Sequence, residues 1–510
     1  MRFYQFRVLL PLFSLLLLLP FALSCSADAP DSELVIESIT IDGLATYIPE
    51  TGETELYEKT IYETLYDGMR AMSPKIDIRS FGITQNQIKD IVTTTINMYP
   101  ELYYVSNGFR YGISNGTIPY VMPEYNEMDT VKINAEIAKM NAVMNEILEG
   151  VDKLSDPVDK LLVIHDRLAL YFSYDTTLTD HSAHGLLLNG RAVCQGYASA
   201  FYALATRAGI TAGFVDSEAM KHIWNAFYID GCWYHADVTW DDPVSDLYGR
   251  ALHTYFLKSN EALAGHTDYT PLENDATDLD NAFWNDAQGV IYPIGDFYYY
   301  LSDEERALVK FDTETGLVTV LRSIRQAWPA NTSQTSFWAA LFSGLTLRNG
   351  RFYYNRGDSL YSCDLYGENT RKESLALPES LAENNSLYGF YERGGVLYFQ
   401  YCDLLAPSNG GYEYTSYSST FTIPVVDGKL YLCDERNVDG AYALTFVNES
   451  GKPVSIFQAK KTAGRISAVE YEAVETTALT VFVTAEQNVV YLLDEKLRPL
   501  YASWKRTQVE

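Results

Sequence analysis

The chain has 510 residues, of which 47% are hydrophobic and 21% charged, and its formal net charge at pH 7 is −29. A chain of this length buries a complete hydrophobic core and has room for more than one domain. The acidic charge argues against nucleic acid or anionic lipid as an electrostatic partner, because both require positive charge on the protein.

The first 25 residues have the pattern of a secretion signal. Arg2 and Arg7 are followed by a long apolar run, and small residues lead to Cys25. The ending ALSC resembles a bacterial lipobox, so we predict that residues 1–24 are a signal peptide and that residues 25–34 are an acidic tether lipidated at Cys25. The expected location is the bacterial cell envelope, with a lipid anchor in the membrane and the protein facing outside the cytoplasm. A plain signal peptide or an uncleaved N-terminal anchor is the alternative.

Loss of the two arginines in residues 1–24 takes the formal charge from −29 to −31. The remaining cysteines show no CxxC pair and no regular spacing: Cys194, Cys232, Cys363, Cys402 and Cys433. This pattern disfavours a disulfide framework and gives no zinc motif, although pairing among the last three stays open. We expect neither a metal nor another cofactor.

Hydrophobic periodicity between residues 34 and 171 predicts mostly helices. Alternation indicates a strand within 34–48, and 101–105 is also interpreted as a strand. Helices are predicted at 57–72, 84–98, 129–148 and 157–171. We expect them to be scaffold, with His165 as a hydrogen-bonded core residue of the last helix, whereas the role of His184 is left open.

A further helix is predicted from Cys194 to Ala208, since apolar residues recur there at helical spacing and Gly209 follows. Cys194 is then the first helical residue. A thiol at this position faces unpaired N–H groups and the positive end of the helix dipole, which favour the thiolate. Cys194 is therefore a candidate nucleophile.

The segments 222–229 and 232–240 are rich in aromatic and β-branched residues and are separated by Asp230-Gly231, a two-residue hairpin signal. This register places His222 and Asp237 on one face as diagonal neighbours, with Cβ atoms about 7 Å apart. An imidazole to carboxylate hydrogen bond spans that distance. A nucleophile, a base and an orienting carboxylate are thus expected at Cys194, His222 and Asp237.

The motifs VCQGYASAF and HIWNAFYIDGCWYHADVTWDDP, with their spacing, resemble the core of the transglutaminase-like superfamily. The resemblance implies a papain-like Cys-His-Asp triad at Cys194, His222 and Asp237. It covers about 55 residues closely and extends more loosely to the upstream stretch KLLVIHDRLALYFSYD. The implied fold class is α+β, a papain-like core of helices packed on an antiparallel sheet, and we place this domain with its N-terminal helical extension at residues 35–280.

Other residues near the triad have open roles. Gln195, Trp224 and His235 are candidates for a substrate groove or for contacts behind the triad. His235 shares a face with Asp237, but lies on the same strand, so it is expected to form a wall of the site rather than act as base. Asp241 and Asp242 are expected to make a turn with Pro243.

Residues 281–510 have a different pattern, in which aromatic strands and polar turns recur about every 40 to 50 residues, the length of a four-stranded blade. We predict an all-β domain in the form of a β-propeller of five blades, with a β-sandwich or an irregular all-β domain as the alternative. Its tyrosines suit either packing or a glycan or protein ligand.

The expected function is that of an extracytoplasmic, cysteine-dependent amide or peptide hydrolase or acyltransferase that forms a thioester acyl-enzyme on a peptide or protein substrate. The triad suits both outcomes, with hydrolysis slightly favoured. The alternative is a lipid-anchored surface binding protein that keeps the transglutaminase-like part as an inactive scaffold. A bridging role in the envelope is a third hypothesis.

Overall fold

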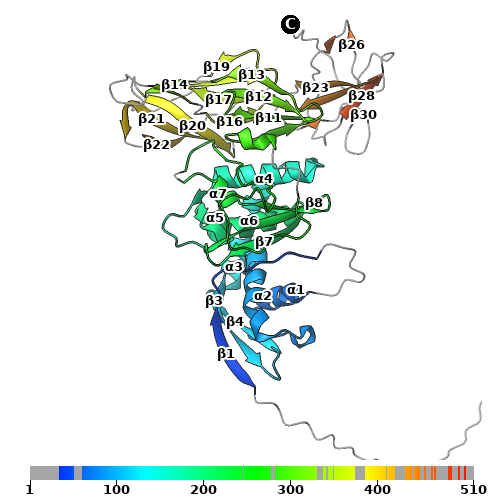
Figure 1. Cartoon of the computed structure of the whole chain (residues 1–510), viewed down its shortest axis with the longest axis vertical. Helices are drawn as coiled ribbons and strands as arrows, with labels where there is room; N and C mark the ends of the chain where they lie inside the picture. Colours follow the sequence, from blue (N-terminus) through cyan, green and yellow to red (C-terminus); the bar gives the residue numbers. More distant parts are fainter. Residues whose placement is uncertain are drawn as a thin grey trace, which may run out of the picture.

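The computed structural model describes residues 34–50, 60–244, 246–276, 282–324, 326–329, 337–340, 343–348, 350–373, 385–394 and 396–408, and the backbone of separate strands between residues 411 and 500. Three tiers follow one another along the chain (Figure 1). Residues 1–33, with Cys25, lie outside the described part, so the lipid anchor stays a prediction. Of the helices in the described ranges, none is both long and apolar enough to cross a membrane.

The first tier is an antiparallel sheet covered by two helices. The sheet has the order β1 (Val35–Thr40), β3 (Val105–Ile113), β4 (Tyr120–Tyr125) and β2 (Ile76–Asp77), and the helices are α1 (Ile61–Arg70) and α2 (Gln85–Met98), with a short 3-10 turn η1 (Arg79–Phe81). Thr60 and Glu63 form a capping box that starts α1. The strand expected at 101–105 is wrong, because Pro100 opens a 3-10 helix, η2 (Pro100–Leu102), and the chain becomes extended only from Val105.

The second tier packs helices on a three-stranded antiparallel sheet. Its elements are α3 (Thr130–Ile147), η3 (Val151–Lys153), α4 (Pro157–Tyr171), α5 (Ala183–Asn189), α6 (Cys194–Arg207) and the sheet β7 (Thr211–Ser217), β8 (His222–Ile229), β9 (Cys232–Ala236), with a small parallel pair β5 (Ser173–Tyr174) and β6 (Arg191–Ala192). Asp129 and Asp156 cap α3 and α4, which start as the sequence predicted. Phe201 of α6 contacts Phe227 of β8, with ring centroids 4.6 Å apart, and both are fully buried. The helix carrying Cys194 is therefore fixed against the sheet carrying His222.

The hairpin has the predicted turn but a shorter second strand. Asp230 and Gly231 both have positive φ, 49° and 89°, as a two-residue turn of this kind requires, and Ile229 pairs with Cys232. The strand expected to reach residue 240 ends at Ala236. Asp237 then caps a short helix, α7 (Val238–Asp241), and the capping bonds replace further strand pairing.

The third tier begins with a 3-10 turn, η4 (Phe283–Asp286), and continues as antiparallel strands. Two sheets have four strands in chain order, and the first contains Tyr292–Ile294, Phe297–Ser302, Ala307–Asp312 and Val318–Ser323 (β10 to β13). The second contains Leu345–Arg348, Arg351–Arg356, Ser359–Asp364 and Arg371–Lys372 (β16 to β19). Smaller groups are formed by Gln326–Pro329 and Phe337–Ala340 (β14, β15) and by Asn385–Arg393, Val396–Ser408 and Gly411–Ser419 (β20 to β22).

The last strands are Tyr431–Val438, Ala441–Val447, Pro453–Val454, Lys461–Thr462, Arg465–Ile466, Thr480–Thr484, Leu492–Leu493 and Pro499–Leu500 (β23 to β30). In the described part of this tier the sheets are open, and a closed ring of blades is not shown, so the propeller and its five blades stay predictions. Cys363, buried in β18, is a free thiol.

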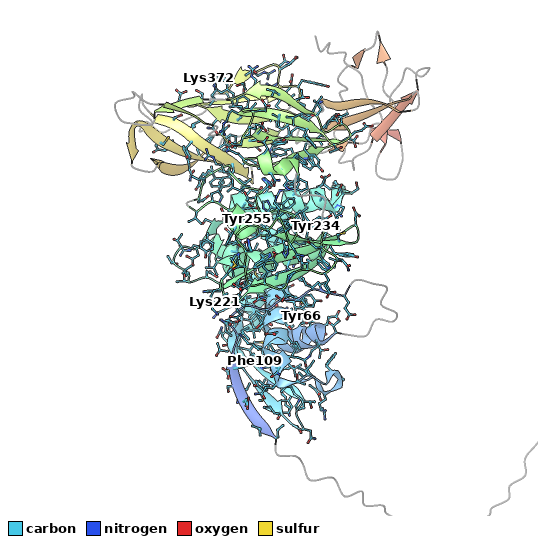
Figure 2. The ribbon with its side chains drawn as sticks, in the orientation of Figure 1. Tyr66, Phe109, Lys221, Tyr234, Tyr255 and Lys372 are labelled. Carbon is cyan, nitrogen blue, oxygen red and sulfur yellow. The ribbon has the colours of Figure 1, made fainter. Side chains whose placement is uncertain are left out.

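The second and third tiers are joined by polar contacts. Arg393 of β20 donates to both carboxylate oxygens of Glu146 on α3, at 3.0 Å each. The Tyr298 hydroxyl of β11 donates to Asp159 of α4 at 2.5 Å. Figure 2 shows Tyr234 and Tyr255 in the second tier and Lys372 at the far edge of the third.

Candidate active site

Cys194 is the first residue of α6, in agreement with the predicted helix start. The residue before it, Val193, makes no side-chain capping bond. Cys194 is 9% exposed and packs in a hydrophobic cluster with Leu44 of the N-terminal tier, Phe214 of β7 and Ile223 of β8. The thiol thus lies at an uncapped helix N-terminus, against the sheet that carries the expected base.

His222 begins β8 and bonds to the expected carboxylate. Its Nε2 lies 2.6 Å from Asp237 Oδ2. Burial opposes protonation of the ring, but the charge and hydrogen bond of Asp237, together with a hydrogen bond to Cys194, raise the pKa of His222 to about 10. A protonated imidazole beside a thiol favours an imidazolium-thiolate pair.

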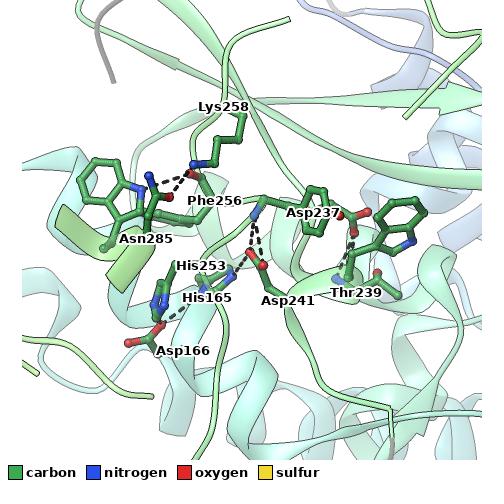
Figure 3. Close-up of polar contacts among 12 residues, drawn as sticks. His165, Asp166, Asp237, Thr239, Asp241, His253, Phe256, Lys258 and Asn285 are labelled. Carbon is green, nitrogen blue, oxygen red and sulfur yellow. Dashed lines mark hydrogen bonds and ion pairs between the residues drawn. The ribbon is translucent and has the colours of Figure 1, made fainter. Parts of the chain in front are cut away.

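Asp237 accepts four hydrogen bonds. Oδ1 accepts from the backbone N–H groups of Thr239 and Trp240, at 3.0 and 3.3 Å, and Figure 3 shows Asp237 above Thr239 at this turn. Oδ2 lies 2.6 Å from Nε2 of His222 and 2.9 Å from Nε2 of His266. Burial opposes ionisation, but the charges and hydrogen bonds of the two histidines hold the pKa of Asp237 well below its usual range. The carboxylate is therefore fixed at both oxygens.

Two tryptophans flank the imidazole of His222. The ring of Trp224 lies 5.7 Å from it at 24°, and that of Trp240 lies 5.4 Å from it at 27°. Trp224 donates from Nε1 to Nδ1 of His235 at 3.0 Å, and Nε2 of His235 faces Asn260 Oδ1 at 2.9 Å. Burial lowers the pKa of His235 to about 4, so this ring is neutral at pH 7 and contacts the triad only through Trp224.

Gln195 bonds to the N-terminal tier. Its Nε2 donates to Asn97 Oδ1 at 3.0 Å, and the Asn97 amide donates to the carbonyl of Gly43 at 3.0 Å. Gly43 has a φ of 83°, and a Cβ there would lie 2.1 Å from Gln195 Oε1, so a larger residue would strain the backbone and displace Gln195. Gln195 joins the N-terminal segment to α6 and does not belong to the lining of the cavity beside His222.

A cavity of about 480 Å³ opens beside His222. Its lining consists of Tyr174, His222, Thr239, Trp240, Asp242, Pro243, Val244 and Leu252. Asp242 is buried and accepts from the Tyr197 hydroxyl, while its Oδ1 has no hydrogen-bond partner in the described structure. Burial raises the pKa of Asp242 well above its usual range. The walls are thus mixed, with aromatic and aliphatic side chains beside an imidazole, two hydroxyl groups and one carboxyl group.

Asp241 and Asp242 were expected to make a turn with Pro243. Asp242 does lie at a bend before Pro243, whereas Asp241 is the last residue of α7, and both side chains are buried. Asp241 Oδ2 lies 3.1 Å from Nε2 of His165, whose Nδ1 lies 3.1 Å from Asp166 Oδ1. His253 Nε2 contacts that same Asp166 oxygen at 2.8 Å. His165, Asp166, Asp241 and His253 form what we call the core cluster, which confirms His165 as a hydrogen-bonded core residue (Figure 3).

His184, whose role was open, stacks on Tyr103 with ring centroids 4.2 Å apart, and its Nε2 lies 3.4 Å from Glu136 Oε2. Two residues that the sequence analysis missed contact the site: His266 bonds to Asp237, and Trp240 stacks on His222. Trp240 follows Asp237 closely in the sequence, so reasoning from local sequence alone could have identified it. His266 lies in a loop without periodicity, so no sequence pattern indicated it.

Two groups have the ligand types and spacing to hold a metal ion: His222, Asp237 and His266, and His165, Asp166 and His253, each with ligand atoms within 4.8 Å of one another. In both groups each histidine has a ring nitrogen at hydrogen-bonding distance from a carboxylate oxygen, from 2.6 to 3.1 Å. Direct hydrogen bonding therefore accounts for both arrangements.

Residues 145–238 match the Transglutaminase-like superfamily. Among curated proteins none matches the chain. Among solved structures, a crystal structure of a TGase is 18% identical over 27% of this chain and 46% of its own, with a TM-score of 0.18, so the chain spans less than half of that protein. The extracellular domain of a one component system from B. thetaiotaomicron is 10% identical over 54% of this chain and 41% of its own, also with a TM-score of 0.18.

Both structural likenesses are weak, and the assignment rests on the sequence match. The matched segment contains Cys194, His222 and Asp237, whereas His266 lies beyond its end. The chain therefore contains a transglutaminase-like domain, within which the hydrogen-bonded histidine and aspartate lie beside the cysteine of α6.

Proposed function

We propose that this chain is a cysteine-dependent enzyme that hydrolyses or transfers the acyl group of amides in peptides or proteins. Cys194 is the nucleophile, His222 carries the proton, and Asp237 orients the imidazole. The observation that carries this proposal is the hydrogen bond of 2.6 Å between His222 and Asp237, with the Cys194 thiol close enough to His222 to help raise the pKa of the imidazole. An activated thiol needs such a base held by a third group.

The reaction begins when the Cys194 thiolate attacks the carbonyl carbon of the amide. His222 gives its proton to the leaving nitrogen as the C–N bond breaks, which leaves a thioester on Cys194 and releases an amine. His222, now neutral, takes a proton from water or from a second amine as it attacks the thioester. The thiolate leaves, and the product is a carboxylic acid or a new amide.

The oxyanion formed in each attack needs hydrogen-bond donors. The backbone N–H of Cys194 at the uncapped start of α6 suits this role, since α6 has no side-chain cap that competes for its first N–H groups. Gln195 is not assigned to it, because its amide is bonded to Asn97. Trp224 and His235 act behind His222 rather than on the substrate.

The cavity beside His222 suits the acyl part of a peptide or protein substrate. Its lining is rich in aromatic and aliphatic side chains, and two of these, Val244 and Leu252, are exposed at 67% and 37%. Exposed apolar residues at the edge of a cavity favour a substrate that continues across the surface.

The predicted signal peptide and lipidated Cys25 would hold the enzyme on the outer side of a bacterial membrane. The third tier would then extend away from the anchor, where it suits a glycan or protein ligand. The formal charge of −29 supports a partner other than nucleic acid.

The test is the rate at which iodoacetamide alkylates each cysteine of the full-length protein at pH 6, located by peptide mass mapping. An ordinary thiol is almost wholly protonated at that pH, with a pKa of about 8.5, whereas a thiolate paired with imidazolium reacts quickly. Fast labelling of Cys194 alone, lost in His222→Ala, is the expected result, and a panel of carboxamide and peptide substrates with and without added amine then separates hydrolysis from transfer. Equal labelling of Cys194 and Cys232 would contradict the proposal.

A second candidate is a surface binding protein with an idle triad. It is favoured by one observation: Cys194 is only 9% exposed and packs against Leu44 and neighbouring aromatic residues of the N-terminal tier. Under this alternative the N-terminal segment covers the thiol, and Cys194 would resist alkylation at pH 9 as well as at pH 6.

A further inference from the structure

We infer that His266 is a positioning residue of the thiol site, which holds the Asp237 carboxylate in the orientation that His222 requires. The inference rests on the proposed function and deepens it. His266 is absent from the lining of the cavity beside His222; it hydrogen-bonds to Asp237, and its ring packs against His222 and the two tryptophans.

The hydrogen bonds of Asp237 carry the argument. An ionised carboxylate has about four lone-pair sites. Two are used by the backbone N–H groups of Thr239 and Trp240 at Oδ1, and two by His222 and His266 at Oδ2. The carboxylate is 1% exposed, so water cannot replace a lost donor without a rearrangement. His266 is thus the fourth donor to a fully satisfied, buried anion.

The position of the His266 ring is fixed by packing. Its side chain has no exposed surface, and its centroid lies 4.2 Å from that of Trp240 and 4.6 Å from that of Trp224. Gly265, with φ of 80°, brings the loop close enough for a Cβ there to lie 3.1 Å from the Trp240 ring. The tryptophans that flank His222 therefore also hold His266.

The direction of the hydrogen bond follows from the charges. Asp237 is ionised, so Nε2 of His266 must donate to it, and Nδ1 faces the carbonyl of Ala264 at 3.3 Å. Without this donor, Oδ2 would keep a single partner, and the carboxylate could tilt toward other donors. The hydrogen bond to His222 would then lengthen, and the imidazolium would lose stabilisation. Because the thiolate depends on that imidazolium, the loss would reach Cys194.

Other ionisable groups face His222 as well. Cys194 lies on α6, Asp237 caps α7, and Tyr174 and Asp242 lie across the cavity. His235 is separated from His222 by Trp224. A substitution at His266 leaves these five ionisable side chains unchanged. A change in the pH dependence of Cys194 labelling therefore reports on the contact between His266 and Asp237.

The experiment compares His266→Phe with His266→Gln in the full-length protein. Phe keeps the ring shape and removes the donor, whereas the Gln amide nitrogen reaches the place of Nε2. Alkylation of Cys194 by iodoacetamide is measured at pH 6 and pH 9. We expect Phe to slow labelling severalfold at pH 6, because the imidazolium that stabilises the thiolate loses its fixed carboxylate partner. At pH 9, where an unassisted thiol is largely ionised, the rate should stay within about twofold of wild type. Gln should retain most of the rate at pH 6.

His253→Phe is the matched control, because His253 is as buried as His266 and also contacts a buried carboxylate, Asp166, but has no contact with Asp237. It should leave the ratio of the rates at pH 6 and pH 9 unchanged. Thermal unfolding of each variant verifies that it is folded. Should Phe prevent folding, His266→Asn takes its place, because the asparagine amide is too short to reach Asp237.

The inference is overturned if Cys194 in His266→Phe or His266→Asn is labelled at the wild-type rate, with an unchanged ratio of the rates at pH 6 and pH 9. The proposed function would still stand. A rate lowered equally at both pH values would also overturn the inference, since that result indicates a general structural effect. If wild-type Cys194 is itself unreactive at pH 6, the proposed function fails and the inference fails with it.

Discussion

Two buried histidine-aspartate clusters lie in the transglutaminase-like tier, and they differ in what surrounds them. In the first, Asp237 binds His222 and His266 beside Cys194 and a cavity of about 480 Å³. The second is the core cluster, in which His165 lies between Asp166 and Asp241 (Figure 3). Its four side chains are at most 2% exposed, and no cysteine of the described chain contributes to it.

The hydrogen bonds of the two clusters are similar, so a histidine-aspartate pair does not by itself identify a catalytic site. What distinguishes the first cluster is a thiol within reach and space for a substrate. The core cluster instead joins elements: Asp166 accepts from the backbone N–H of Ile291 at 2.8 Å, next to β10, and Asp241 belongs to α7. We therefore assign chemistry to the first cluster and a structural role to the second, and the predictions below test this division.

The largest effect is expected for Cys194→Ala. Removal of the nucleophile should lower amide hydrolysis or transfer by at least about a thousandfold, as loss of a covalent nucleophile does in other enzymes. Thermal unfolding should change little, because the alanine fits the space of the thiol. Cys232→Ala on the neighbouring hairpin is the control, and it should leave kcat within about twofold. Activity retained in Cys194→Ala would end the assignment of the nucleophile.

The next effect is expected for Asp237→Ala, which should lower kcat by about a hundredfold or more through misorientation of His222. KM should change less than kcat, since Asp237 is not part of the cavity lining. Circular dichroism should show the fold intact. A kcat equal to that of wild type would remove Asp237 from the triad.

The core cluster should respond in stability rather than in chemistry. His165→Leu leaves Asp166 and Asp241 buried without their shared partner, and loss of one member of a buried ion pair costs about 3 to 5 kcal/mol. Urea unfolding measures this loss. The labelling ratio of Cys194 between pH 6 and pH 9 should remain as in wild type, and a change in that ratio would show that the two clusters are coupled.

The pH dependence of stability distinguishes the clusters further. Burial opposes the charge of His165, but its hydrogen bonds to Asp166 and Asp241 raise its pKa to about 9 from an ordinary value of about 6.5. A group whose pKa is raised on folding stabilises the protein fully below the unfolded value, and this contribution is lost as pH rises through the folded value. Wild-type stability relative to His165→Leu should therefore decline between about pH 6.5 and pH 9. A constant difference across this range would show that His165 is not protonated in the fold.

Local patterns predicted the parts of this molecule that depend on short-range interactions. The helix start at Cys194 and the Asp230-Gly231 turn follow from periodicity and from the demand for positive φ. The pairing of His222 with Asp237 was also predicted, although the strand was expected to continue through Asp237. Asp237 is instead the N-cap of α7. Its carboxylate accepts hydrogen bonds from the backbone N–H groups of Thr239 and Trp240, which are not paired in the hairpin.

Long-range contacts were not predictable in the same way. His266 reaches Asp237 from a loop, and Asp241 reaches His165 from another element of the tier. Such contacts depend on how whole elements pack, and a single sequence gives no periodicity that relates them. The third tier was predicted as β-rich from its aromatic strands. Whether its sheets close into a propeller depends on how successive repeats pack side by side, and repeats as weak as these do not predict that packing.

The smallest effect is expected for His235→Ala. His235 is neutral above about pH 4 and accepts from Trp224, so it supplies no proton to His222 in the working range. Its loss leaves the Trp224 N–H unpaired in the core, which should lower the thermal midpoint by a few degrees, since a buried unpaired donor costs about 1 to 3 kcal/mol. The value of kcat should fall by no more than about threefold, with an unchanged pH profile between pH 5 and pH 8, because Trp224 remains held by its contacts with His266 and Tyr269. Complete loss of activity in folded His235→Ala would instead identify this histidine as the base and transfer the role now assigned to His222.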